Sequence, residues 1–304
     1  MKDLSILEFP SNLGLIEPMP GQEPGVGQLP AWLEQHHFHS LVNPLKIYKI
    51  PPPAYTMAID PDSGVRNADA IASYAQQQAT LLKKLINEKT FAVALGGDCS
   101  ILIGNTLALK QLGNFALFFL DGHTDFAWPS LSASKGAAGM DLAIVTGHGH
   151  EKLSNILGLA PYIREEHAWS VGNRDFDPRY ISAITRSKIN YYDLNKLREA
   201  GIENCCDLFL KMVMEQKLDG FWIHLDADVL DDEIMPAVDS REKGGMSYEE
   251  LKTILSILFS SPRCAGIEIT ILDPTLDKNG VYTKQFAAQI GQLIRDKKTG
   301  DERF

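Results

Sequence analysis

Short, mainly apolar segments without polar alternation are separated by longer amphipathic segments along this chain. The apolar segments are residues 91–95, 115–120, 169–171, 221–225 and 264–269, and the longer ones are 67–88, 203–217, 247–260 and 281–296. Strands that are buried on both faces are mainly apolar and do not alternate with polar residues, and parallel strands need long, usually helical, crossovers between them. We therefore predict an α/β fold, a three-layer αβα sandwich around a mainly parallel sheet.

The sequence also indicates how many domains the chain forms. A chain of 304 residues is compatible with one large domain or with two small ones. The one proline run, residues 51–53, lies too near the start to separate two full domains, and the sequence has no repeat of fixed period. We expect a single domain that spans residues 1–304.

Composition excludes several classes of protein. The formal net charge of −10 disfavours a nucleic-acid partner, because such binding depends on Lys and Arg that neutralise phosphates. No apolar run approaches the ~20 residues that a membrane helix needs, so we expect no membrane partner. The first residues lack the features of a signal peptide, and the four cysteines are too few for a disulfide scaffold. We expect a cytoplasmic protein.

Three polar motifs directly follow apolar segments. Residues 96–100 are Gly-Gly-Asp-Cys-Ser, residues 121–125 are Asp-Gly-His-Thr-Asp, and residues 226–228 are Asp-Ala-Asp. Ligands of parallel α/β sheets bind beyond the carboxyl ends of the strands, near a switch in strand order. We expect the three motifs to meet at this edge of the sheet.

The spacing within two of these motifs indicates a metal site. If the chain stays extended, Asp121, His123 and Asp125 project to the same side, and Asp226 and Asp228 repeat this arrangement on another strand. Either pattern alone is more often a turn or a solvated strand end. Four carboxylates brought together would repel one another without a cation, whereas hard divalent ions prefer oxygen-rich sites. The two patterns together predict a site for two divalent ions.

The three motifs, in this order and at these separations, resemble the metal motifs of the arginase and agmatinase (ureohydrolase) family. The resemblance spans most of the chain. It implies a binuclear-metal hydrolase that cleaves a C–N bond of a guanidine- or amidine-type small molecule. It further implies two divalent ions, manganese above all, bridged by a hydroxide that attacks the substrate carbon, and a homo-oligomer that is a trimer or a hexamer.

The same resemblance implies a role for each side chain of the motifs. The first ion would take Cys99, Asp121, Asp125 and Asp226, and the second would take His123, Asp121, Asp226 and Asp228. Asp125 would also orient the bridging hydroxide, which makes it the catalytic residue of this assignment.

Four positions depart from the pattern of the family. Cys99 stands where the family has histidine; as a soft thiolate ligand it would let zinc or iron compete with manganese, and as a small buried residue it would bind no metal. A branch of the family that acts on hydroxylated arginine is similar in carrying cysteine here. Ala138 replaces a proton-shuttle histidine, Ala127 replaces a substrate-binding asparagine, and Ile271 replaces the glutamate that pairs with the guanidinium group.

Candidate substrate-binding residues come from the same comparison with the family pattern. Ser134, Asp175 and Asp177 match positions that contact the amino-acid end of arginine, although the turn that holds both aspartates could equally be structural. Because Ile271 cannot pair with a cation, Asp239 is a candidate replacement; its loop lies at the active-site mouth in the family. A solvated loop aspartate is the alternative.

The changed pocket leaves two alternatives to a guanidine hydrolase open. One is a hydrolase of an N-modified guanidine or of an uncharged ureido or amide compound. The other is a non-catalytic homologue with a regulatory or assembly role. We interpret His224, two residues before Asp226, as a strand residue without an assigned function, and Cys205, Cys206 and Cys264 as core residues.

Overall fold

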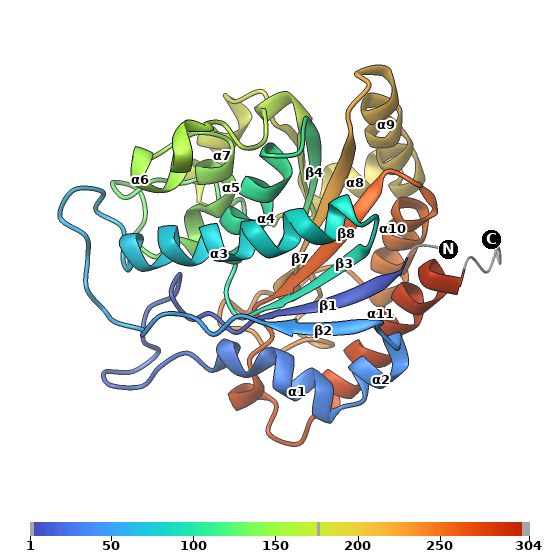
Figure 1. Cartoon of the computed structure of the whole chain (residues 1–304), viewed down its shortest axis with the longest axis horizontal. Coiled ribbons are helices and arrows are strands. Elements are labelled where there is room, and N and C mark those ends of the chain that lie inside the picture. The colour runs from blue at the N-terminus through green and yellow to red at the C-terminus, as the bar shows by residue number, and fades with distance from the viewer. Residues whose placement is uncertain (1–2, 175–176, 300–304) are drawn as a thin grey trace.

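One sheet of eight parallel strands runs through the protein (Figure 1). The computed structural model describes residues 3–174 and 177–299. The order of the strands is β2-β1-β3-β8-β7-β4-β5-β6. Their bounds are β1 (Leu4–Phe9), β2 (Lys46–Lys49), β3 (Phe91–Gly96), β4 (Phe115–Leu120), β5 (Ala168–Val171), β6 (Asn190–Tyr192), β7 (Gly220–Asp226) and β8 (Cys264–Thr270). The predicted parallel sheet is confirmed.

The sequence pattern predicted the five strands β3, β4, β5, β7 and β8, and it did not predict β1, β2 and β6. Strands β2 and β6 are the two edges of the sheet; they are short, and their side chains are partly or fully exposed. Strand β1 is buried at every position but contains Ser5 and Glu8. Glu8 is stabilised in the interior by His39, whose Nε2 lies 3.1 Å from its Oε1. The edge strands β2 and β6 lack the mainly apolar run of the predicted strands, and in β1 two polar residues interrupt such a run.

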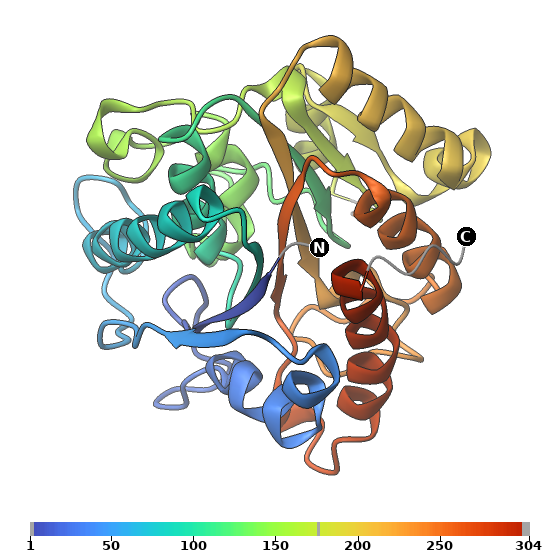
Figure 2. The ribbon, with the colours of Figure 1, turned by 45° about the vertical axis from the view of Figure 1, so that its right-hand side comes forward.

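Helices cover both faces of the sheet, which gives three layers (Figure 2). One face is covered by α3 (Ala68–Asn87), α4 (Ile101–Lys110), α5 (Asp141–Val145), α6 (Glu151–Ser154) and α7 (Pro178–Thr185). The other face is covered by α1 (Leu29–Gln35), α2 (Phe38–Val42), α8 (Leu194–Ala200), α9 (Ile202–Glu215), α10 (Tyr248–Ser260) and α11 (Val281–Thr299). Each layer encloses its own apolar core, so the three-layer sandwich predicted from the sequence is confirmed.

Helix α10 begins where a short sequence signal predicts it. The Ser247 hydroxyl accepts the backbone N–H of Glu250 at 3.2 Å, and the Glu250 carboxylate accepts the backbone N–H of Ser247 at 2.8 Å. This reciprocal capping box satisfies two N–H groups that the first turn of a helix otherwise leaves without a partner.

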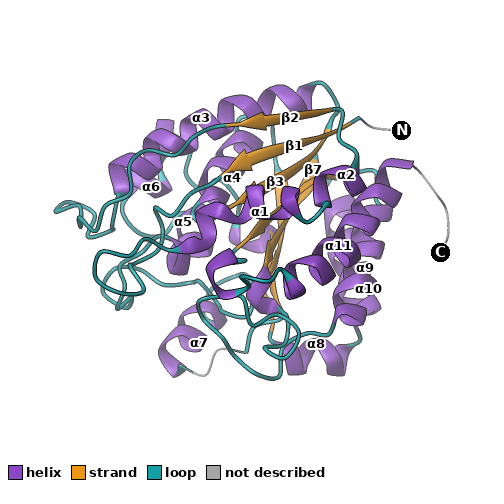
Figure 3. Ribbon diagram, turned by 90° about the horizontal axis from the view of Figure 1, so that it is seen from below, coloured by secondary structure: helices purple, strands orange, loops and turns teal. Residues whose placement is uncertain are grey.

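The centre of the sheet contains a switch in strand order. Strands β3 and β4 follow one another along the chain, but β8 and β7 lie between them in the sheet. Strand β4 leads to α5 on one face of the sheet, whereas its neighbour β7 leads to α10 on the other face. The connections that leave the carboxyl ends of these two strands therefore diverge, and a crevice forms between them. Loops gather at this edge of the sheet (Figure 3). The three polar motifs follow β3, β4 and β7, so they meet here as predicted.

Gly97 allows the loop after β3 to cross closely over the loop after β1. A Cβ atom at residue 97 would lie 1.7 Å from the carbonyl oxygen of Ser11, a backbone atom that cannot move aside. We expect Gly97→Ala to lower the free energy of unfolding by at least the ~1–3 kcal/mol typical of overpacking, measured by urea denaturation. Gly139→Ala is the matched control, because a Cβ there meets nothing within 4 Å. Equal stability of the two variants would contradict this account.

Candidate metal centre

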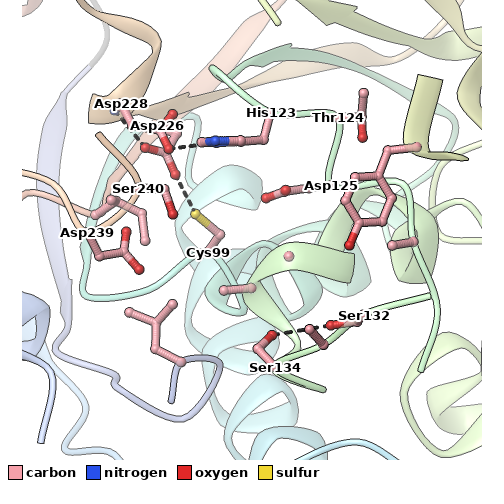
Figure 4. Close-up of a pocket in the computed structure, with 17 residues that line it drawn as sticks. Cys99, His123, Thr124, Asp125, Ser132, Ser134, Asp226, Asp228, Asp239 and Ser240 are labelled. Atoms are coloured by element: carbon pink, nitrogen blue, oxygen red, sulfur yellow. Dashed lines mark hydrogen bonds and ion pairs between the residues drawn. The ribbon is translucent and has the colours of Figure 1, made fainter. Parts of the chain in front are cut away.

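Cys99 lies in the loop between β3 and α4, with its thiol directed toward the end of β7 (Figure 4). Its Sγ is 2.9 Å from Asp226 Oδ2 and 3.2 Å from the hydroxyl oxygen of Thr270. The residue is 1% exposed. Burial, and then the charge of Asp226, raise the pKa of the thiol well above its usual value. In the absence of a cation Cys99 is therefore a neutral hydrogen-bond donor.

The motif after β4, residues 121–125, forms a turn that a hydrogen bond within the motif closes. Asp121 is fully buried, and its Oδ1 accepts the backbone N–H of His123 at 2.6 Å. The ring of His123 points across to the β7 motif, where its Nδ1 lies 2.9 Å from Asp228 Oδ2. Asp125 has a φ of 42°, in the left-handed region, so the extended chain assumed from the spacing does not continue to this residue. The side chain of Asp125 nevertheless lines the same pocket as His123 (Figure 4).

The motif after β7 is held by a helix cap. Asp226 ends the strand and its Oδ1 accepts the backbone N–H of Asp228 at 2.8 Å, which starts the short helix Ala227–Val229. Asp228 in turn accepts the backbone N–H of Gly122 at 3.0 Å, which joins the β7 motif to the β4 motif. The two carboxylates therefore converge through a cap and not through the extended strand that the spacing suggested.

The electrostatics of these carboxylates fit a bound cation. Burial and then neighbouring carboxylates raise the pKa values of Asp121 and Asp226 well above the usual range. Burial also raises the pKa of Asp228, but His123, the Gly122 N–H and Arg174 outweigh it and the net shift is downward. Oδ2 of Asp121 is buried without a hydrogen-bond partner in the described residues. Divalent cations would relieve both the repulsion and this unsatisfied oxygen.

Ligand atoms of Asp121, His123 and Asp228 all lie within 4.8 Å of one another. This group agrees with three of the four ligands predicted for the second ion. The fourth, Asp226, lines the pocket beside them together with Cys99 and Asp125. The structure thus brings the predicted metal-binding side chains together at one place, where the residues present fit two divalent ions.

A pocket opens above this cluster (Figure 4). Its floor is formed by the predicted metal-binding side chains other than Asp121, and its walls include Ser132, Ser134, Tyr180, Asp239 and Ile271. The hydroxyl groups of Ser132 and Ser134 lie 3.2 Å apart on one wall. A small molecule that enters this pocket would reach the metal-binding residues at its end.

Of the four predicted substrate-binding residues, the structure places Ser134 and Asp239 in the pocket wall. The Asp239 side chain is exposed, but its place in the pocket wall removes part of its hydration, and this desolvation and then the charge of Asp228 raise its pKa to about 6. Asp177 is not among the lining residues: it caps α7 by accepting the backbone N–H of Arg179 at 2.8 Å and pairs with the guanidinium of the same residue. Asp175 lies outside the described residues.

All four positions that depart from the family pattern line the pocket, Ala127, Ala138 and Ile271 together with Cys99. Ala138 leaves this part of the wall apolar. Ile271 is 3% exposed and has a φ of 71°, a left-handed conformation that is strongly disfavoured for a β-branched side chain. The bond from its N–H to the Gly97 carbonyl oxygen, 2.8 Å long, helps to hold it there. Such strain costs about 1–3 kcal/mol and tends to occur at functional sites.

Comparison with known proteins assigns the chain to a family. The family model described as "Arginase family" matches residues 26–294. The chain belongs to the arginase family. The family comprises binuclear-metal hydrolases that cleave C–N bonds of guanidine- and amidine-type compounds. The family, the fold and the enzyme class predicted from the sequence are therefore confirmed.

Several members of the arginase family are similar over most of their length. The arginase of Bacillus subtilis is 30% identical over 238 residues, which are 78% of this chain and 79% of that protein. The structure of arginase from Bacillus caldovelox has a TM-score of 0.86 at 25% identity and covers 97% of this chain and 98% of the other. Formimidoylglutamase from Bacillus subtilis has a TM-score of 0.75 at 22% identity, covers 100% of this chain and 89% of the other, and shares the fold.

Two buried residues at the centre did not emerge from the sequence as candidates. His224 lies on β7 as predicted, but its ring belongs to a group of potential ligand atoms with Asp121 and Asp226. Asp141, at the start of α5, forms another such group with Cys99 and His224. The spacing of two between His224 and Asp226 was a usable signal. Asp141 carries no local signal, because it reaches the centre from a different helix.

Proposed function

We propose that this chain uses a binuclear metal centre to hydrolyse a C–N bond of a guanidine- or amidine-type small molecule. One observation carries the proposal: buried, mutually repelling carboxylates of two loops meet His123 and Cys99 at the floor of an open pocket. A non-catalytic homologue has no physical reason to retain such a cluster, because each buried carboxylate destabilises the fold unless a cation compensates it.

Each residue at the centre would have its own role, either in metal binding or in orienting the attacking water. His123 and Asp228 would hold one ion and Cys99 the other, with Asp121 and Asp226 near both. Asp125 would accept a hydrogen bond from the attacking water and orient it, since it lines the pocket beside these residues. Bound divalent ions supply Lewis acidity and lower the pKa of water. Manganese is our first assignment; the thiol of Cys99 also makes zinc or iron suitable.

The pocket walls favour an N-modified guanidine or an uncharged ureido or amide group over unmodified arginine. The apolar side chain of Ile271 occupies the wall where a cation partner is expected, and no base stands at Ala138. A cationic substrate buried against Ile271 would lose hydration without gaining an opposite charge. The carboxylate of Asp239 and the hydroxyl groups of Ser132 and Ser134 remain available to bind polar substituents.

The test of this function combines metal analysis with a substrate panel. Protein dialysed against manganese should hold close to two ions per chain. It should then release urea from an N-substituted guanidine, an amide from an amidine, or ammonia from a ureido compound in a panel of such molecules. Arginine and agmatine should have kcat/KM values below the ~10⁴ M⁻¹s⁻¹ at which ordinary enzymes begin. Fewer than about one ion per chain, or no turnover across the panel with two ions bound, would contradict the proposal.

The remaining properties that we propose concern the whole protein. Across residues 3–174 and 177–299, no helix combines the length and the apolar character needed to cross a bilayer. We propose a cytoplasmic enzyme with a small-molecule substrate and with neither a nucleic-acid nor a membrane partner. We also propose a single domain over residues 1–304, because strands from both halves of the chain pair in one sheet. A homo-oligomer, trimer or hexamer, follows from the family resemblance alone.

A further inference from the structure

A second set of potential ligand atoms lies beside Cys99, away from His123. The Cys99 sulfur, a carboxylate oxygen of Asp141 and a ring nitrogen of His224 all lie within 4.8 Å of one another. Asp141 and His224 are fully buried, and Cys99 is 1% exposed. His224 also forms a group of the same kind with Asp121 and Asp226. His224 therefore belongs both to the group that contains the thiol and to the group that contains the predicted bridging carboxylates.

The orientation of His224 is that of a metal-bound histidine. Its Nδ1 lies 2.5 Å from Oε1 of Glu268 on the neighbouring strand β8. Its ring stacks on Phe119 of β4, with centroids 4.4 Å apart and planes 8° apart. A carboxylate that accepts Nδ1–H leaves the lone pair on Nε2, and this carboxylate–histidine arrangement is typical of histidines that bind metals.

Other buried groups fix Glu268 in this role. The indole Nε1–H of Trp222 donates to its Oε2 at 3.1 Å, and the side-chain amide of Asn105 donates to the same oxygen. Glu268 is itself fully buried. The imidazole ring is thus held by Phe119 on one side and by an anchored carboxylate at Nδ1.

One polar atom of each of three residues in these two groups is unsatisfied. Within the described part of the chain, Nε2 of His224, Oδ2 of Asp141 and Oδ2 of Asp121 are buried without a hydrogen-bond partner. The closest approach recorded between two of them is 3.8 Å, from Nε2 to Asp121 Oδ2, which is beyond hydrogen-bonding distance. Buried polar atoms without partners are rare, and three of them in two groups that share His224 are what a cation site requires.

We propose that His224 and Asp141 are metal ligands, and that with Cys99 they form an ion position that prefers zinc or iron(II) over manganese. The inference rests on the proposed metal centre and changes the ligands of one of its two ion positions. His224 supplies from β7 the imidazole that residue 99 lacks, and Asp141 adds a carboxylate from α5. A donor set of sulfur, nitrogen and oxygen suits these softer ions, whereas the carboxylate-rich position at His123 suits manganese. The centre then holds two different metals.

A purely structural role for this cluster makes a different prediction. A buried network that only supports the fold would satisfy its polar atoms internally, by hydrogen bonds between Asp141, His224 and their neighbours. Asp141 forms one such bond, from the backbone N–H of Leu142 to its Oδ1 at 2.5 Å, and its other oxygen forms none with the described residues. If Asp141 is a neutral acid with a structural role, an amide of the same shape should replace it without consequence.

Cobalt titration of the metal-free full-length protein tests this inference, because a Co²⁺–thiolate bond gives its own charge-transfer absorption. We expect wild type to develop this absorption as Co²⁺ binds. His224→Phe keeps the stacking on Phe119 and Asp141→Asn keeps the shape, yet each should weaken Co²⁺ and Zn²⁺ binding at the thiolate position. The loss should be at least the ~10–100-fold that follows removal of an outer partner of a ligand.

Two control variants separate this position from the rest of the protein. His123→Asn removes the imidazole of the other position, so it should lower total metal content and keep the thiolate absorption. His167→Phe replaces a buried histidine that lies 2.7 Å from the Gln216 side-chain oxygen and touches none of these residues, so it should leave metal binding unchanged. Melting curves of all variants, recorded without metal, show which of them fold.

The outcomes distinguish this inference from the proposed function. Thiolate absorption with unchanged affinity in Asp141→Asn and His224→Phe would overturn the ligand roles and leave a binuclear centre built from the aspartates, His123 and Cys99. If His224→Phe does not fold, Asp141→Asn decides, because the amide has the same size and shape as the carboxyl group that it replaces. Absence of any metal binding in wild type would overturn the proposed function and this inference together.

Discussion

Asp226→Ala is expected to remove both metal ions and to abolish hydrolysis. The two oxygens of Asp226 face the two halves of the centre: Oδ2 lies 2.9 Å from the Cys99 sulfur, and Oδ1 accepts the N–H of Asp228 at 2.8 Å. Alanine removes both oxygens, and it also removes the cap that holds Asp228 in place. Metal content after dialysis against manganese, and turnover of the best substrate of the panel, measure the two losses.

Thermal stability provides a third measure of the same change. A ligand at a hundredfold excess over its dissociation constant stabilises the folded state by ~2.7 kcal/mol, so wild type should melt at a higher temperature when metal is added. Asp226→Ala should fold but show no such shift. Asp207→Ala, which removes an exposed carboxylate on α9, is the control and should behave as wild type. Retention of two ions by Asp226→Ala would show that the centre lies elsewhere.

The fold was predictable where short, mainly apolar runs stood out from their surroundings. Strands β3, β4 and β7 are buried at every position, and each is followed directly by a polar motif, so both the sheet and the location of the centre followed from the sequence. The strands β1, β2 and β6 contain polar or exposed residues and are recognisable only from their pairing. Pairing between segments that are distant in the chain depends on the tertiary structure, so a local sequence pattern does not predict it.

Some residues of the metal centre could be predicted from local sequence motifs, and others could not. Asp121 and Asp226 were predictable because each belongs to a dense local motif. His224 was not assigned, because a strand buried on both faces gives no alternation from which the direction of a side chain can be read. Only the register of β7 against β8, which pairs His224 with Glu268, identifies its partner. Asp141 reaches the centre from α5, and no spacing within the sequence connects it with Cys99.

Asp177 shows the opposite case, in which a local signal was present and supports the structural alternative. An aspartate followed by proline is a strong signal for the start of a helix, because the carboxylate caps the first turn and proline fits its first position. The structure shows Asp177 capping α7, with Pro178 as the first residue of the helix. Contact of Asp177 with the substrate stays a prediction, and it competes with this capping role.

Ile271→Glu is expected to raise kcat/KM for arginine and agmatine on the order of 10²–10³-fold. Removal of one partner from a buried ion pair costs about 3–5 kcal/mol, so restoring a carboxylate opposite a buried guanidinium should recover a similar amount. Residue 271 lines the pocket and is 3% exposed, so the new carboxylate would be shielded from water. Its φ of 71° is also less strained for an unbranched side chain than for isoleucine.

Ile271→Gln is the matched control, because glutamine has the size, the shape and the backbone preference of glutamate without its charge. If the gain comes from pairing with a cation, Ile271→Gln should show little of it, and the Ile271→Glu gain should be absent for uncharged ureido substrates. If both variants gain equally, the gain comes from relief of backbone strain or from the wider pocket. If wild type already hydrolyses arginine efficiently, another group pairs with the guanidinium; the carboxylate of Asp239, which lines the same pocket, is then the residue to replace.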